Sequence, residues 1–259
     1  MGMEDPKRQR IVVLGSGPAL ASATRDNTFF LIDSAAGSLL IDCAGSPFHK
    51  LLKAGVDPER LKGVILTHAH PDHVYGLPSL VHELWLYGRR EALHIYANGH
   101  THGVVRTLLD AFELREKPVP LELHFIPSEE TFLLLETELY AVYSSPVRHQ
   151  VPTNAVRFAS RVNGKVAVWS SDTSPCRELV SLARGAELLF QECSVEELHP
   201  FHCTPEQVGE LAGEAQVGEV ILAHCHPNLV KEPYLTIAEI RKQYHGRVQF
   251  AEDFDVYEL

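Results

Sequence analysis

The sequence predicts an α/β (α+β) protein in which two β-sheets pack face to face and helices cover their outer surfaces. Strand and helix patterns mix in both halves of the 259-residue chain, and neither a linker nor a low-complexity segment separates the halves. Apolar runs such as residues 61–66 are typical of buried strands. The length is sufficient for one large domain with a substantial core. We therefore expect residues 1–259 to form a single two-sheet domain.

The first half begins with strands and then alternates between strands and helices. Residues 34–37 form a small turn containing a glycine, which indicates a hairpin, and Gly55 follows a predicted helix as its stop signal. The predicted strands are residues 11–14, 27–33, 38–42, 61–66 and 93–97, and the predicted helices are residues 47–54, 74–87 and 103–112.

In the second half, strands come first and helices follow between further strands. Asn163-Gly164 is a strong signal for a hairpin, while Thr204 and Pro205 are suited to the start of a helix. The predicted strands are residues 121–126, 131–135, 138–144, 155–162, 165–170, 187–192, 220–223 and 247–251, and the predicted helices are residues 175–183, 204–214 and 237–244.

Charge and cysteine content narrow the class of protein. The formal net charge of −11 counts against a broad nucleic-acid footprint, which needs clustered Lys and Arg. Five widely spaced cysteines with no Cys-x-x-Cys pair are not a disulfide framework, so we expect a reducing cytoplasm. We expect no membrane association, because no signal-like region follows the start and no apolar run reaches membrane-spanning length.

Residues 67–76 hold the strongest chemical signal, because His68, His70, Asp72 and His73 fall within six positions. They lie where a buried strand passes into a helix, which is where α/β proteins place their sites. In an extended chain His68 and His70 project to the same side, whereas Asp72 and His73 follow a proline and face the site from elsewhere. Imidazole and carboxylate are ligands of zinc, manganese and iron. The alternative is a histidine-rich surface turn.

Further metal ligands are expected just after other buried strands. His149, Asp172 and His224 meet this criterion, and the two oxygens of Asp172 are suited to bridging two cations. His226 is close enough to His224 to stay open as a candidate. The other histidines within predicted helices, strands or polar turns are interpreted as structural or solvated: His49, His82, His94, His100, His102, His124, His199 and His245.

This order of ligands, together with several short segments, resembles the metallo-β-lactamase superfamily, and in particular its ribonuclease Z branch. Residues 40–45, 51–55 and 67–78 are similar to that branch's opening motifs, and residues 170–175 resemble its aspartate motif. Gln191-Glu192-Cys193-Ser194 resembles its His-Glu-Ala-Thr segment, and His202-Cys203-Thr204 resembles its His-Ser-Thr segment. The resemblance extends from Gly15 to about His226.

The resemblance implies the metallo-β-lactamase fold, an αββα sandwich of two mixed β-sheets flanked by helices. It also implies two divalent metal ions, usually zinc and sometimes manganese or iron. The ligands it implies are His68, His70 and His149 for one ion, Asp72, His73 and His224 for the other, and Asp172 as the bridge.

A hydrolytic mechanism follows from such a pair of ions, because together they lower the pKa of a bridging water and neutralise charge on the substrate. His202 is the candidate proton donor to the leaving group, and Glu192 would orient its ring. Asp72 is a further candidate catalytic residue. The alternative for the Glu192–His202 pair is a supporting hydrogen bond or a contact at a helix start.

The leading hypothesis is a phosphodiesterase of small or cyclic phosphodiesters, with a small-molecule substrate. The alternative on the same fold is a lactonase, thioesterase or β-lactamase-like esterase. A tRNA 3′-processing endoribonuclease is a further alternative, but residues 150–171 leave no room for the protruding basic arm of many such enzymes. That alternative would need a homodimer in which the partner's surface replaces the arm. A non-catalytic metal or nucleic-acid binding module is disfavoured, because purely structural zinc sites close with four ligands.

Overall fold

The computed structural model describes residues 8–117 and 119–259, and within them the strands form two seven-stranded sheets. The first sheet has the order β14-β1-β2-β3-β4-β5-β6 and the second β13-β12-β11-β10-β9-β8-β7. The strands of the first are β1 (Gln9–Gly15), β2 (Phe29–Ser34), β3 (Gly37–Ile41), β4 (Leu61–Leu66), β5 (Leu93–Ala97), β6 (Leu121–Phe125) and β14 (Val256–Glu258). Those of the second are β7 (Phe132–Glu136), β8 (Tyr140–Val147), β9 (Thr153–Ser160), β10 (Val166–Trp169), β11 (Leu188–Cys193), β12 (Glu219–Cys225) and β13 (Arg247–Phe250).

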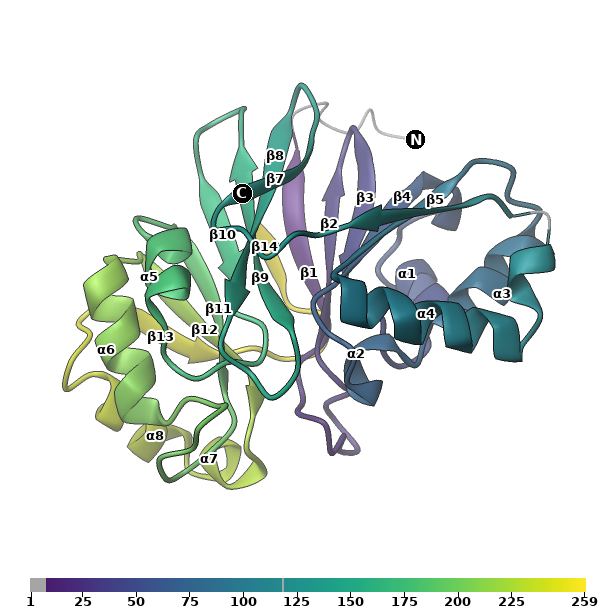
Figure 1. Cartoon of the computed structure of the whole chain (residues 1–259). Coiled ribbons are helices and arrows are strands. Elements are labelled where there is room, and N and C mark those ends of the chain that lie inside the picture. Colours follow the sequence, from purple (N-terminus) through teal and green to yellow (C-terminus); the bar gives the residue numbers. More distant parts are fainter. Residues whose placement is uncertain (1–7, 118) are drawn as a thin grey trace.

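Helices lie on the outer face of each sheet, so the protein has four layers (Figure 1). Those beside the first sheet are α1 (Pro47–Lys53), α2 (Pro71–Val74), α3 (Leu77–Tyr87) and α4 (Gly99–Ala111). Those beside the second are α5 (Arg177–Ala183), α6 (Pro205–Ala215), α7 (Pro227–Lys231) and α8 (Pro233–Ile240). Short 3₁₀ turns cover Pro58–Arg60 and Leu114–Glu116. Each sheet contains parallel and antiparallel pairs, so the predicted αββα sandwich of mixed sheets is confirmed.

Alternation along the strands explains why the layers form. In β1, Ile11 and Val13 pack into the core between the two sheets, whereas Val12 and Leu14 pack against the helices outside. Successive side chains of a strand point to opposite faces, so a strand that is apolar on both faces must be covered on both. The continuous apolar runs in the sequence therefore correspond to central strands of a four-layer protein.

The predicted helix 74–87 is two helices in the structure. Pro71 starts α2 and Pro78 lies in the first turn of α3, where its missing N–H group costs nothing. Between them, the Gly76 N–H donates to Cys43 O at 2.9 Å, and a Cβ on Gly76 would lie only 2.9 Å from the same oxygen. This close approach fixes α2 against the end of β3 and breaks the helical pattern.

Other differences concern short elements. The predicted helix 237–244 is α8, which begins at Pro233 and ends at Ile240, and α7 and β14 were not predicted. The strand β14 has three residues and forms by pairing with β1, so its own sequence carries little signal. The Asn163-Gly164 hairpin is confirmed, since β9 and β10 pair antiparallel around a short turn in which Gly164 has φ +76°.

Two further predictions concern cysteines and membrane spans. All five cysteines are free thiols, four of them buried. In the part of the chain that the structure describes, no helix has the length and apolar character needed to cross a membrane.

Candidate metal centre

The candidate site lies where strand ends of the two sheets meet. His68 follows β4 of the first sheet, while His149 follows β8, Asp172 follows β10 and His224 lies near the end of β12, all of the second sheet. His70 caps the start of α2, and the turn at Pro71 brings the residues after it back toward His68. The structure thus brings together all seven residues that the sequence suggested as ligands, in two groups.

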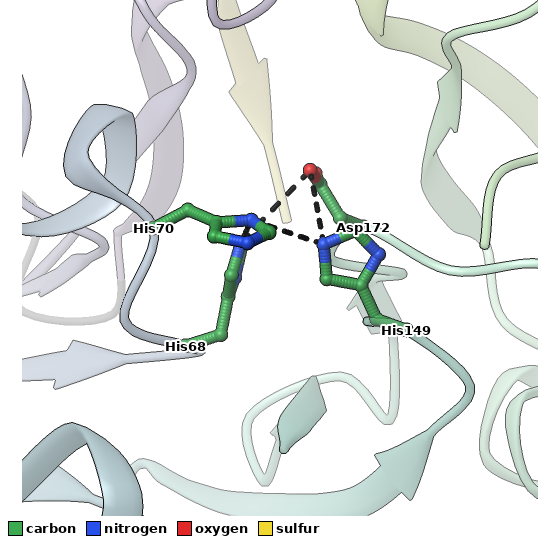
Figure 2. A group of neighbouring side chains, drawn as sticks. All are labelled: His68, His70, His149 and Asp172. Atoms are coloured by element: carbon green, nitrogen blue, oxygen red, sulfur yellow. Dashed lines mark hydrogen bonds and ion pairs between the residues drawn. The ribbon is translucent and has the colours of Figure 1, made fainter. Parts of the chain in front are cut away.

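The first group consists of His68, His70, His149 and Asp172 (Figure 2). The Nδ1 atom of His70 lies 3.1 Å from Nε2 of both His68 and His149. Oδ2 of Asp172 lies 3.9 Å from each of the same two Nε2 atoms. Around a tetrahedral ion with bonds of about 2.0–2.1 Å, donor atoms are roughly 3.4 Å apart. The observed spacings bracket this value, so the four atoms are arranged as donors around one small cation.

The second group consists of Asp72, His73 and His224. Oδ2 of Asp72 lies 3.4 Å from His73 Nε2 and 3.2 Å from His224 Nε2. The other oxygen of Asp172, Oδ1, lies 3.6 Å from both of these nitrogens. Asp172 therefore presents one oxygen to each group.

Two polar atoms within the site support the fit of a metal. His73 Nε2 and Asp172 Oδ1 are buried and have no hydrogen-bond partner among the described residues. Buried polar atoms almost always have a partner, because leaving one unpaired is costly. A cation within the second group would satisfy both atoms, and their nitrogen and oxygen donors suit divalent ions of the first transition row. The site is accordingly a centre for divalent metal ions.

The protonation states of the first group favour metal binding. Burial and the neighbouring imidazoles of His73 and His149 hold the pKa of His68 well below its usual value. Burial also lowers the pKa of His149 to about 4, although Asp172 opposes the shift. These rings are therefore neutral near pH 7, which is the form that ligates metals.

The second group pairs an ionised aspartate, Asp72, with a protonated histidine, His73. Burial opposes ionisation of Asp72, but its hydrogen bond with His224 and the nearby charge of His73 lower its pKa below the usual value. Burial also opposes protonation of His73, yet the charges of Asp42 and Asp172 raise its pKa well above the usual value. A cation bound at His73 Nε2 would replace that proton and keep the neutralising charge.

Asp42 holds the His73 ring in place. It is fully buried at the end of β3, and its Oδ2 accepts a 2.8 Å hydrogen bond from His73 Nδ1. Its Oδ1 accepts from the backbone N–H and the hydroxyl of Thr67, both at 2.8 Å, and Trp169 Nε1 donates to Oδ2 at 3.4 Å. With Nδ1 committed to Asp42, the Nε2 atom of His73 is left facing the site.

Two other rings, those of His149 and His224, are oriented in the same way. His149 Nδ1 donates to the carbonyl oxygen of Phe201 at 3.1 Å. His224 Nδ1 lies 3.0 Å from Ser194 Oγ, whose hydroxyl donates to the His224 carbonyl oxygen. Each contact fixes the tautomer so that Nε2 points into the site.

Glu192 and His202 form a further pair beside the first group. Glu192 is fully buried, and its Oε1 lies 3.2 Å from His202 Nδ1. The His202 side chain is 20% exposed, and its ring centroid lies 5.0 Å from that of His149. Burial would lower the pKa of His202, but the hydrogen bond and charge of Glu192 raise it above the usual value.

Glu192 also supports the backbone, which is the alternative role considered for it. Its Oε1 accepts from the N–H groups of Cys203 at 3.0 Å and Thr173 at 3.2 Å, and its Oε2 accepts from Ser194 N–H at 2.8 Å. Cys203 directly precedes the Thr204 cap of α6. One carboxylate therefore ties the β10–α5 loop to both ends of the β11–α6 loop and also orients His202.

The remaining histidines are placed elsewhere. His226 belongs to neither group: it caps α7, and its Nδ1 lies 3.3 Å from Glu196 Oε1. The sequence pattern did not single out Asp42, because the predicted strand 38–42 included it; in the structure β3 ends at Ile41 and Asp42 directly follows it. His94 and His124, interpreted as structural or solvated, lie with Glu122 in a third cluster.

The fold and the site define a class of protein, the metal-dependent hydrolases built on an αββα sandwich. The chain belongs to the β-lactamase superfamily, whose domain profile matches residues 30–225. It is 28% identical to a ribonuclease Z of Ignicoccus hospitalis over 84% of this chain and 88% of that protein. The predicted resemblance to the ribonuclease Z-like branch is thereby confirmed, and the protein is an enzyme, a metal-dependent hydrolase.

Solved structures agree in fold. The metallo-β-lactamase fold protein YhfI from Bacillus subtilis superposes with a TM-score of 0.81 at 22% identity, over 97% of this chain and all of that one. A diphosphatase from the PhnP family superposes with a TM-score of 0.75 at 22% identity, over 97% of each chain.

Replacing Asp42 by asparagine should weaken metal binding. The amide cannot accept from His73, Thr67 and Trp169 with both of its terminal atoms, so the His73 ring loses its fixed orientation. Losses of about 10–100-fold in metal affinity are usual when such a supporting group is removed. Competition with a chromophoric chelator measures the affinity. The matched control is Asp33→Asn, which changes an aspartate paired with Arg10 away from the site; equal affinities in both variants would contradict the role of Asp42.

Proposed function

We propose that the protein is a dinuclear metal-dependent phosphodiesterase that acts on small or cyclic phosphodiesters. The observation that carries the proposal is the Glu192–His202 pair beside a site with two groups of ligands. An alkoxide leaving from phosphorus needs a proton, and a histidine whose pKa is raised by a buried carboxylate can supply it. A lactone or thioester needs less help with its leaving group.

Two ions, zinc or alternatively manganese or iron, are assigned to the two groups. His68, His70 and His149 would bind one, Asp72, His73 and His224 the other, with Asp172 between them. Support comes from the two oxygens of Asp172, which face different groups. Bound there, two divalent ions would lower the pKa of water and neutralise charge developing on the substrate.

The protein's own side chains would then orient the reaction and move a proton. Contacts with Asp42, Phe201 O and Ser194 orient three rings, those of His73, His149 and His224, with Nε2 toward the metal site. His202 would donate its proton to the leaving oxygen, and Glu192 would stabilise the protonated ring before transfer. Asp72 is ionised beside His73 and His224, so it would contribute negative charge and a ligand oxygen.

A small substrate fits the charge and the shape of this chain. The net charge is −11, and the segment between β9 and β10 is a short turn with no room for an RNA-binding arm. The structurally similar diphosphatase also favours phosphorus chemistry. A tRNA-processing endoribonuclease acting as a homodimer remains the second candidate, because relatives found by sequence include ribonucleases Z. An esterase acting on lactones or thioesters is the third.

A panel of three substrates separates these candidates. Purified protein loaded with zinc or manganese should hydrolyse bis-p-nitrophenyl phosphate and leave an acyl lactone intact. A precursor tRNA should be cleaved poorly, because the acidic surface offers few contacts to phosphates. Initial rates give kcat/KM for each compound. Lactone cleavage without phosphodiester turnover would overturn the proposal, and preferred cleavage of the tRNA would support the second candidate.

Replacing His202 by alanine should lower kcat for a phosphodiester by about 10²–10⁴-fold, the range for loss of a general acid. Because the acid form is the active one and its pKa lies above the usual value, kcat of the wild type should fall as pH rises through that pKa. This alkaline fall should disappear in His202→Ala, while metal content stays unchanged.

The matched control is the neighbouring His199, whose ring lies 5.3 Å from that of His202. In His199→Asn a side-chain oxygen can still accept from the Phe201 N–H, so turnover should stay near the wild-type value. Loss of metal from His202→Ala, or equal rates in both variants, would contradict the proton-donor role.

Replacing Asp172 by alanine should remove at least one ion per chain, since the residue faces both groups. Elemental analysis after desalting gives the content, and circular dichroism checks that the variant is folded. Full occupancy in a folded Asp172→Ala variant would rule out the bridging role.

A further inference from the structure

A second set of side chains of the types that ligate metals lies on β5 and β6, outside the candidate metal centre (hereafter the main centre). In the parallel pairing of these strands, His94 lies opposite Glu122 and Tyr96 lies opposite His124. Alternate residues of a strand point to the same face, so all four side chains share one face of the sheet. That face continues the core between the two sheets, where Tyr96 is partly buried.

Three ligand atoms converge on this face. His94 Nδ1 lies 2.9 Å from His124 Nε2 and 3.3 Å from Glu122 Oε2, and His124 Nε2 lies 3.9 Å from the same oxygen. Ligands of a tetrahedral zinc ion are separated by roughly 3.4 Å. The three distances bracket this value, as they do in the buried groups of the main centre.

One contact holds the ring of His124 in position and another holds its backbone. Tyr96 stacks on it with centroids 4.6 Å apart and an angle of 18° between the planes. His102 Nε2 lies 2.9 Å from the carbonyl oxygen of His124 and would donate to it, which fixes the backbone at the same residue. A preorganised ligand loses less conformational freedom when it binds. The cluster therefore contains one ligand, His124, that is already held in position.

The cluster is accessible from solvent. The side chains of His94, His124 and Glu122 are 35%, 39% and 54% exposed, and β6 is the edge strand of its sheet. None of the three belongs to the groups of the main centre.

We propose that His94, Glu122 and His124 bind one further divalent ion of the zinc class, with water in the fourth position. Two imidazoles and a carboxylate form a donor set that zinc accepts. The ion would join the edge strand β6 to β5 by ligand bonds in addition to the backbone ladder. It would thereby stabilise the pairing of β6 with β5 at the edge of the first sheet. This effect would be independent of the reaction at the main centre.

Zinc stoichiometry tests the proposal. Calorimetric titration of the metal-free full-length protein with Zn²⁺ should give one more equivalent for the wild type than for Glu122→Gln or His94→Ala. Both variants should keep wild-type phosphodiester turnover, because neither residue belongs to the main centre. The control His245→Ala removes an exposed histidine outside every cluster and should bind as many ions as the wild type. Equal stoichiometry in the wild type and both cluster variants would overturn the proposal.

Hydrogen exchange gives a second readout that does not depend on activity. Saturating Zn²⁺ should slow amide exchange in the peptide covering Leu121–Phe125 of the wild type, because the ion opposes local opening of the edge strand. The same addition should leave that peptide unchanged in Glu122→Gln. Equal slowing in the wild type and the variant would contradict an ion bound at this cluster.

Discussion

The organisation of the metal centre depends on the carboxylate of Asp172. It is only 3% exposed, yet it lies between two sets of imidazoles and presents one oxygen to each. Burial disfavours its charge, but His224 and His73 lower its pKa, so the group stays ionised. A buried charge with an unpaired oxygen is costly unless cations are present. The burial of Asp172 between the two groups therefore favours bound cations.

A second buried carboxylate, Asp42, connects this centre to the scaffold. It receives hydrogen bonds from the end of β4, from α2 and from Trp169 of β10, which belongs to the other sheet. Both sheets therefore contribute to the orientation of His73. The packing of one sheet on the other, through Phe30, Trp169 and Phe190, bears directly on the position of a ligand.

The cluster of His94, Glu122 and His124 has the same types of ligand as the main centre but is less buried. Its ligand atoms have spacings like those of the main centre, but its side chains are partly exposed to solvent. In the main centre, His73 Nε2 and Asp172 Oδ1 are buried without a partner. Water can satisfy the exposed cluster when no ion is present, so a bound ion there would act on the edge strand without being a condition for the surrounding fold.

Local patterns in the chain were sufficient for the layered architecture and for the seven residues of the main centre. Apolar runs indicate strands covered on both faces, and the strand-end criterion selected His149, Asp172 and His224 because the ends of neighbouring strands meet at one edge of a sheet. The spacing of His68, His70, Asp72 and His73 is local as well, since one turn at Pro71 divides the four between two groups. Glu192 and His202 were found through motif resemblance.

Features that depend on contacts distant in sequence were decided only by tertiary structure. The break between α2 and α3 arises where Gly76 meets Cys43, and β14 exists because β1 offers it a free edge. The supporting role of Asp42 and the cluster of His94, Glu122 and His124 both depend on which strands lie side by side and in what register. Strand register is set by packing over the whole sheet and is not encoded in any short segment, which is why spacing alone could not reveal them.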